Sequence, residues 1–370
     1  MKTSKPSRMQ HIDIARGIGI IIIVFAHNYL ASKYNGSTLF ALTVSASFNM
    51  PLFYMLSGVF FKAAEPFADV VKKKFDTIMV PYFVTLLCTA LFRFLVQDRL
   101  SFHFLLYRIK TILLGTGGVI DFSWAALWFL PSLFVTIVAF KIVYDMLLRR
   151  LPNKGATLVA VFTILVLGYL LIRSDNHYYQ QIRELYYGLP WSLDIMPIAL
   201  FYFSVGYYGK QFLMEMHDNN ELNRYALFIS LPLFVALMLY SPAGVDLNRR
   251  QYDSLIICTL KALTGIIAIV GFSGMLEKSS LNNVKNWLAT AGRLSLFIFL
   301  FHGIVQNSTF NLLTEHTFLA KQVAAVVSFI LALTMPIAFY YFVICKVRIL
   351  QAIYDPARQK RQPSPAPQNI

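Results

Sequence analysis

The sequence predicts an all-α, polytopic integral membrane protein of about ten transmembrane helices, and three observations support this class. Hydrophobic residues make up 57% of the 370 residues and charged residues only 14%. The mean hydropathy is +0.58. Soluble domains carry about 25% charged residues, so an ordinary cytosolic enzyme, a disordered chain and a coiled coil are excluded. Apolar segments recur along the chain with no long soluble stretch between them.

Ten segments have the length of about 20 residues and the apolar composition that a bilayer-spanning helix needs. The longest gap between them, residues 97–123, contains an amphipathic piece that we expect to lie in the membrane interface. Residues 1–345 therefore form one transmembrane domain, and residues 346–370 are expected to be a basic, proline-rich cytoplasmic tail without fixed structure. The expected spans are residues 12–33, 39–61, 76–96, 124–147, 155–173, 193–209, 225–241, 255–276, 287–306 and 321–345.

The basic residues predict the orientation of these spans. Short cytoplasmic loops collect Lys and Arg, and with ten spans 20 of the 33 basic residues fall on the side of the N-terminus, 10 on the other side and three within spans. Both termini are therefore predicted to be cytoplasmic. The net charge of +15 has the same explanation, and the lipid bilayer is the expected partner. No nucleic-acid partner is expected, because no basic stripe accompanies a base-stacking module.

The cysteines give no indication of a metal or a disulfide framework. Cys88, Cys258 and Cys345 each stand alone in an apolar run. The sequence has none of the short Cys or His spacings typical of zinc sites. No bound metal is therefore expected.

The first span contains ionisable residues that are costly inside a bilayer and often mark a functional site. Arg16 and His27 are 11 residues apart, which is 20° from three full helical turns, so both project from one face about 16 Å apart along the axis. Asp13 precedes Arg16 by three residues and can pair with it. Each residue alone has a structural explanation: Arg16 as a snorkelling anchor, Asp13 as a partner of the helix dipole and His27 in a helix–helix hydrogen bond. Together on one face they favour a site.

The second, fourth and sixth spans each contain a polar or aromatic candidate next to a proline. Asn49 lies two residues before Pro51, where it either satisfies a backbone group that the proline frees or faces a cavity. Trp128 fits an aromatic belt at the outer interface. Asp194 opens the sixth span, either as a helix-start residue or as a group that holds an acceptor hydroxyl.

The ninth span contains Arg293 and His302, nine residues apart. A regular helix places them on opposite faces, Arg293 near the cytoplasmic end and His302 near the outer end. Both can line one passage only if this helix is irregular. We therefore place Arg293 in the passage and give His302 a packing role or a role at the outer loops.

Four segments resemble, in order and spacing, the membrane-bound acyltransferase-3 family, and more closely its fucose O-acetylase-like branch. They read RGIGIIIIVFAHN, SFNMPLFYMLSGVFF, LWFLPSLF and GRLSLFIFLFHGIV, and the resemblance covers about residues 10–345. It implies a ten-helix enzyme of the bacterial inner membrane that moves an acetyl group from cytoplasmic acetyl-CoA. The implied acceptor is a sugar hydroxyl of a cell-envelope glycan or glycolipid, such as O-antigen or exopolysaccharide.

Acyl transfer to a hydroxyl assigns roles to the candidates. His27 is expected to act as general base or as a covalent acyl carrier, and the sequence leaves both routes open. Asp13 and Asn49 complete the expected catalytic group, Asn49 as a donor to the developing oxyanion. Arg16 and Arg293 are expected to bind the phosphates of acetyl-CoA.

The acceptor sugar is expected to enter from the opposite side of the membrane, where Trp128, Asp194 and His302 lie. The competing class is a transporter or glycan flippase without acyl-transfer chemistry. Against this class, the sequence shows no paired halves with matching interrupted helices. A homo-oligomer is compatible with the sequence.

Overall fold

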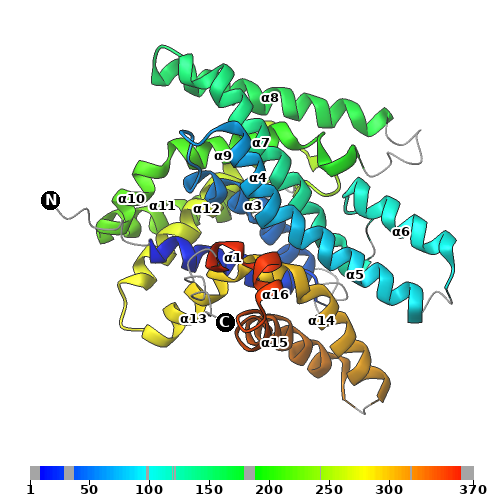
Figure 1. The fold of residues 1–370 in the computed structure, drawn as a ribbon. Helices are drawn as coiled ribbons and strands as arrows, with labels where there is room; N and C mark the ends of the chain where they lie inside the picture. Colours follow the sequence, from blue (N-terminus) through cyan, green and yellow to red (C-terminus); the bar gives the residue numbers. More distant parts are fainter. Residues whose placement is uncertain are drawn as a thin grey trace, which may run out of the picture.

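The protein is helical nearly throughout in the computed structural model, which describes residues 9–28, 37–96, 100–118, 120, 122–178, 188–241, 243–316 and 319–359. Figure 1 shows the helices packed around a common centre. In the first half of the chain they are α1 (Gln10–Ala26), α3 (Ser37–Val59), α4 (Phe67–Lys74), η1 (Phe75–Met79), α5 (Val80–Val96), α6 (Phe102–Leu114), η2 (Phe122–Trp128), α7 (Phe129–Met146), η3 (Leu148–Arg150) and α8 (Lys154–Tyr178).

The second half contains the remaining helices and one small hairpin. Strands β1 (Val245–Asp246) and β2 (Gln251–Tyr252) pair antiparallel, with Val245 opposite Tyr252. The helices are η5 (Pro190–Ser192), α9 (Met196–Tyr208), α10 (Lys210–Asp218), α11 (Asn220–Tyr240), α12 (Leu255–Glu277), α13 (Asn282–Arg293), α14 (Ser295–His316), α15 (Lys321–Phe339), η6 (Tyr340–Ile344), α16 (Arg348–Tyr354) and α17 (Pro356–Gln359).

Seven helical stretches of the described residues are long and apolar enough to cross a membrane. This number confirms a polytopic helical membrane protein, whereas ten spans and the predicted orientation remain predictions. Residues 29–33 of the first predicted span lie outside the described part of the chain. The seven stretches are Phe67–Val96, Trp124–Arg150, Lys154–Arg173, Asn220–Tyr240, Leu255–Glu277, Ser295–Glu315 and Lys321–Ile344.

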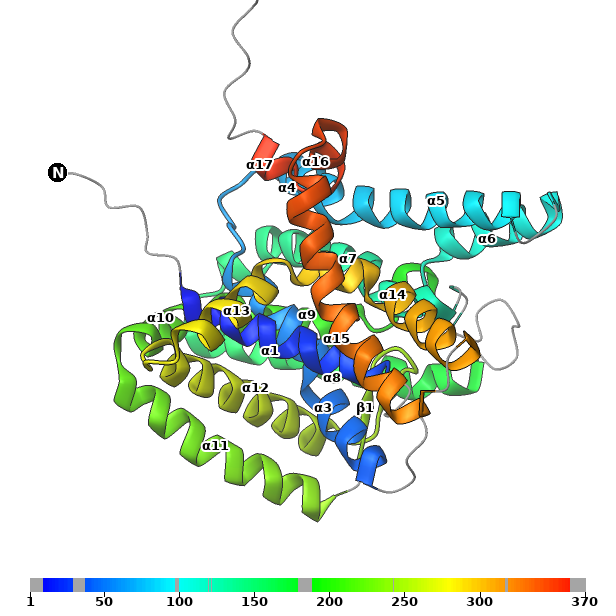
Figure 2. The ribbon, with the colours of Figure 1, turned by 90° about the horizontal axis from the view of Figure 1, so that it is seen from below.

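Helix α1 is the hub of the fold. It packs against α3, α12, α13, α14 and α15, and Figure 2 shows it among them near the middle of the molecule. Ile12, Ile14, Ile20 and Val24 are fully buried. A helix that is apolar on most of its faces is buried in the interior of a bundle, which explains the place of α1.

Glycines allow two pairs of these helices to touch backbone to backbone. A Cβ atom added to Gly17 would lie 2.1 Å from the carbonyl oxygen of Leu288 on α13, and one added to Gly292 would lie 1.8 Å from that of Asp13 on α1. Helices α3 and α9 meet in the same way at Gly58. Small residues give close packing between membrane helices, where no hydrophobic force drives the helices together.

The predicted ninth span, residues 287–306, is not one helix. Helix α13 ends at Arg293, Leu294 has φ −99° and ψ 15°, and α14 begins at Ser295. The helical phase between Arg293 and His302 therefore cannot be calculated as if the helix were continuous. The structure therefore contains an irregular helix here, which is the condition under which Arg293 and His302 can both line one passage.

The segment after Lys346 is more ordered than the expected tail. It forms α16 and α17, and three side-chain contacts attach it to the bundle. Tyr340 donates a hydrogen bond to Asp355 (2.5 Å), Thr85 and Tyr354 share one (3.0 Å), and Gln351 donates one to the carbonyl oxygen of Cys345 (2.5 Å). Residues 360–370, the rest of the predicted tail, lie outside the described residues.

Candidate active site

His27 is the residue at which α1 ends. Its ring Nδ1 lies 2.8 Å from the carbonyl oxygen of Ile23, one turn back on the same helix. A carbonyl accepts only, so Nδ1 carries the proton of a neutral ring, and the lone pair is on Nε2. His27 therefore presents the nitrogen atom that a general base or a nucleophile needs.

His302, on α14, lies directly against His27. The centroids of the two rings are 5.3 Å apart and the rings are inclined at 66°. His302 repeats the same local geometry: its Nδ1 lies 2.9 Å from the carbonyl oxygen of Phe299, and its buried Nε2 makes no hydrogen bond with the described protein. The structure thus brings together two residues from opposite ends of the sequence.

Further polar groups surround the pair. Gln306 lies one turn after His302 on α14, is 2% exposed, and neither of its amide atoms has a hydrogen-bond partner among the described residues. Asp246, on β1, is close enough to His27 to interact with it electrostatically. Buried polar groups without partners are costly, and this cost is relieved when water or a polar ligand fills the space beside them.

Asn49 is also buried, and its Oδ1 makes no hydrogen bond with the described residues. Pro51, two residues later, lies inside α3. The role of Asn49 as a donor to an oxyanion stays a prediction.

Arg16 lies eleven residues before His27 on α1. Its Nη2 donates to the carbonyl oxygen of Leu56 (3.3 Å), and its guanidinium carbon lies 4.7 Å from the centre of the Phe60 ring. Lys74 is close enough for the two positive charges to interact. Arg16 is therefore part of a cationic region near the end of α1 at which the chain begins.

Arg293 and Asp13 lie along the contact between α1 and α13. Arg293 is the last residue of α13, is exposed, and donates to Thr290 on the same helix (2.5 Å). Asp13 is 4% exposed, and its backbone touches Gly292. Arg293 thus presents its charge beside α1, and its role in cofactor binding stays a prediction.

Trp128 lies on η2, which packs against α14. It is buried, and its ring meets Phe129 edge to face at 6.2 Å. Phe129 contacts Phe299 (5.8 Å), which contacts His302 (5.7 Å). An aromatic wall therefore connects Trp128 to the histidine pair.

Asp194 forms a buried ion pair with Arg250. The guanidinium donates from Nε to Oδ2 (2.8 Å) and from Nη2 to Oδ1 (3.2 Å), and it also reaches the Ser192 hydroxyl (3.2 Å). Arg250 has a φ of 57° and belongs to the turn between β1 and β2. The pair fixes the hairpin that places Asp246 near His27. Asp194 stabilises this hairpin, and its predicted contact with an acceptor hydroxyl remains a prediction.

The hairpin also borders a cavity of about 270 Å³. Its walls are mostly polar and include three arginines, one aspartate and one tyrosine. They are formed by Ile172, Arg173, Arg249, Arg250, Gln251, Tyr252 and Asp253.

Sequence reasoning missed the contacts between residues that are distant in the chain. The pairing of Asp194 with Arg250 spans 56 positions, and that of His27 with His302 spans 275. Helical phase relates residues within one helix, so it gives no information on the second pairing, which joins two helices. For the first, no local pattern distinguishes Arg250 from the neighbouring Arg249.

The fold and the site define a multi-pass helical membrane protein with paired histidines and further polar groups among its helices. An acyltransferase domain, that of the acyltransferase-3 family, matches residues 9–343. The chain belongs to the acyltransferase-3 family and is a membrane acyltransferase. No curated protein and no solved structure matches the chain.

Proposed function

We propose that the protein is a membrane O-acetyltransferase of the bacterial inner membrane that moves an acetyl group from acetyl-CoA to a sugar hydroxyl of a cell-envelope glycan. The observation that supports it best is the contact between His27 and His302, each with its Nδ1 held by a carbonyl oxygen and its Nε2 free. Within an acyltransferase, such nitrogens are suited to remove a proton from a hydroxyl. The fucose O-acetylase-like branch and O-antigen or exopolysaccharide acceptors are part of this proposal.

The reaction is written with His27 as the base. Its Nε2 takes the proton of the sugar hydroxyl while the oxygen attacks the thioester carbon. The tetrahedral intermediate expels the CoA thiolate, which takes the proton from the imidazolium. The products are an O-acetyl ester and free CoA, and no other reactant is needed. The amide of Asn49 serves as a donor to the oxyanion.

The alternative route uses the same nitrogen as a nucleophile. Nε2 of His27 attacks acetyl-CoA, CoA leaves, and the acetyl-imidazole then transfers its acetyl group to the sugar hydroxyl. In this route CoA leaves as a thiolate. His302, in contact with His27, accepts the hydroxyl proton and releases it to solvent, from which the thiolate is protonated, so that both imidazoles return to the neutral form. The two routes differ in whether an acetylated enzyme accumulates when no acceptor is present.

The donor is proposed to bind beside the N-terminal half of α1, which carries Arg16. CoA phosphates need cationic partners, and Arg16 lies close to Lys74 there. Arg293 is exposed on the neighbouring α13. Asp13, buried between α1 and α13, is proposed to keep Arg16 oriented.

The acceptor is proposed to approach along the β1–β2 hairpin. The cavity of about 270 Å³ beside the hairpin has polar and aromatic walls, the composition that recognises sugars through hydrogen bonds and stacking. Trp128 contributes through the aromatic wall that reaches His302. Asp194 holds the hairpin in place through Arg250.

The test is acetyl-CoA cleavage by the purified protein in lipid nanodiscs, with and without a glycan acceptor. We expect slow hydrolysis without acceptor, and its loss in His27→Ala. His103→Ala is the matched control because His103 is an exposed histidine of α6, and it should keep full turnover. If His27→Ala retains near-normal turnover at equal abundance, the assignment fails. Glycan movement without acetyl-CoA cleavage would instead support a transporter.

A further inference from the structure

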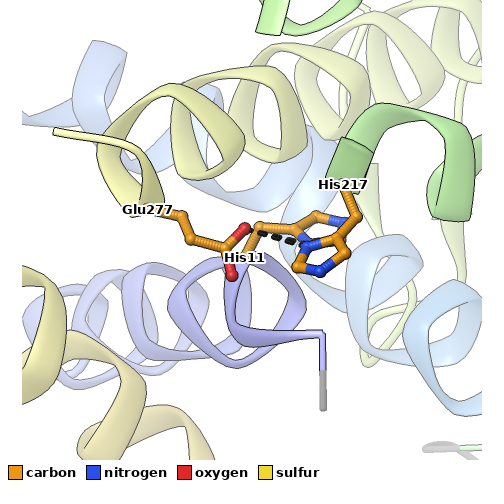
Figure 3. A group of neighbouring side chains, drawn as sticks. All are labelled: His11, His217 and Glu277. Atoms are coloured by element: carbon orange, nitrogen blue, oxygen red, sulfur yellow. Dashed lines mark hydrogen bonds and ion pairs between the residues drawn. The ribbon is translucent and has the colours of Figure 1, made fainter. Parts of the chain in front are cut away.

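Two histidines and a glutamate from three helices meet at the opposite end of α1 from His27. His11 is the second residue of α1, His217 is next to last in α10, and Glu277 is the last residue of α12. Figure 3 shows the two rings lying over each other, with the carboxylate beside them. The three side chains are 0%, 24% and 12% exposed. The cluster is therefore mostly enclosed, with His217 at its accessible edge.

The distances in the cluster match those between ligands of one small metal ion. Nδ1 of His217 lies 3.1 Å from Oε2 of Glu277, and Nδ1 of His11 lies 3.6 Å from the same oxygen. One ligand atom from each residue lies within 4.8 Å of the other two. Tetrahedral zinc, with bonds of about 2.1 Å, separates its ligand atoms by about 3.4 Å. Small side-chain rotations would bring all three atoms to one ion.

An ion pair between His217 and Glu277 does not explain why the side chain of His11 is buried beside them. Its ring is fully buried, and neither nitrogen makes a hydrogen bond of normal geometry. It stacks on His217 with 5.3 Å between ring centroids and 18° between planes. Its polar neighbours are the Glu277 carboxylate, 3.6 Å from Nδ1, and the backbone of Leu213. A buried imidazole without a well-formed hydrogen bond costs about 1–3 kcal/mol, and a metal bond would remove this cost.

The charge state of His11 fits a ligand. His11 precedes the predicted spanning segment, and burial, with a smaller contribution from His217, lowers its pKa to about 4. Asp218 also interacts electrostatically with His11 and favours a cation there, whereas Lys278 opposes one.

We propose that His11, His217 and Glu277 form a binding site for a divalent transition-metal ion, with Zn²⁺ as the ion their chemistry suits best. Two imidazoles and one carboxylate are a common zinc ligand set, and water would complete the tetrahedron. His11 is 16 residues before His27, about 24 Å along the helix, so the ion takes no part in acetyl transfer.

The proposed ion joins the start of α1 to the ends of α10 and α12. Helix α1 also carries Arg16 and His27, so the site would fix the helix on which the proposed donor and base residues stand. Its effect is therefore on the position and stability of α1, which can be measured without any activity assay. The sequence analysis predicted no bound metal because positions 11, 217 and 277 are far apart and show none of the short spacings of zinc motifs.

The experiment uses the full chain, purified through a tag without histidines, in detergent micelles. Elemental analysis by mass spectrometry should find about one zinc per chain after incubation with ZnCl₂ and gel filtration. Zn²⁺ should raise the unfolding temperature, and a chelator should reverse this rise. His217→Ala and Glu277→Gln, both at partly exposed positions, should weaken zinc binding by more than about 100-fold, beyond the 10–100-fold typical of outer-shell partners.

His103→Ala is the control and should bind zinc as the wild type does, because His103 lies on α6, away from the cluster. His11→Phe keeps an aromatic ring in the buried position and should fold without binding zinc. Less than about one zinc per ten chains in the wild type, or unchanged zinc binding in His217→Ala and Glu277→Gln, would overturn the proposal.

Discussion

Replacing Gly292 by alanine should damage the protein, although alanine is the better helix former by up to about 1 kcal/mol. The added Cβ would lie 1.8 Å from the carbonyl oxygen of Asp13, and real Cβ atoms essentially never approach closer than 3.0 Å. Helix α13 would have to move from α1 by the difference, about 1.2 Å. Forced overpacking of this kind costs about 1–3 kcal/mol.

The same displacement should reach the histidine pair. Helix α13 continues through Leu294 into α14, which carries His302, while α1 carries His27. A misplacement of about 1 Å at a reacting group costs about 100-fold in rate. We therefore expect Gly292→Ala to lower acetyl-CoA turnover about 100-fold without removing any chemical group.

The assay is thermal unfolding followed by tryptophan fluorescence, together with turnover, in the same detergent. Gly155→Ala is the control: its Cβ would meet only the exposed Asn153 side chain, at 3.2 Å, so this variant should be as stable as the wild type or more stable. A wild-type unfolding temperature and full turnover in Gly292→Ala would refute the close helix contact.

Three further predictions concern the site and the topology. Arg293→Ala should raise the KM for acetyl-CoA several-fold, because a phosphate contact made equally in the ground and transition states is lost. His302→Ala should lower kcat and leave this KM unchanged. The reverse pattern would contradict the proposed position of the donor site. Arg250→Ala should destabilise the protein by about 3–5 kcal/mol, because it leaves the buried Asp194 carboxylate unpaired, and an unchanged unfolding temperature would contradict the buried pair. A reporter fused after Lys154 should read cytoplasmic, and a periplasmic signal there would refute the predicted orientation.

The membrane class and the approximate helix positions were predictable because the bilayer imposes a length and an apolar composition on each span. Helix α12 (Leu255–Glu277) matches the predicted span 255–276 closely. The break at Leu294 was not predictable, because no proline or glycine occupies that position and both neighbouring segments have helical sequences. Tertiary packing of α13 on α1 and of α14 on α15 determines it.

The candidate site was predictable where its residues lie within one helix. Arg16 and His27 could be related to each other by counting residues along α1. The contact of His27 with His302 and the cluster of His11, His217 and Glu277 depend on which helices are neighbours, and one sequence contains no such information. Ionisable residues inside apolar segments therefore indicated that a site exists. Which residues meet in that site could be found only from the fold.

The central place of α1 has a consequence for the order in which the protein assembles. Helix α1 is synthesised before the other described helices, yet four of its partners, α12 to α15, begin at residue 255 or later. At 5–20 residues per second, about 230 residues of synthesis separate α1 from α12, so α1 waits about 10–50 s for it. During that interval Asp13 and Arg16 have no C-terminal helices around them. Assembly around α1 must therefore finish after translation of the last helices, which makes truncation near the C-terminus as damaging to the site as mutation within it.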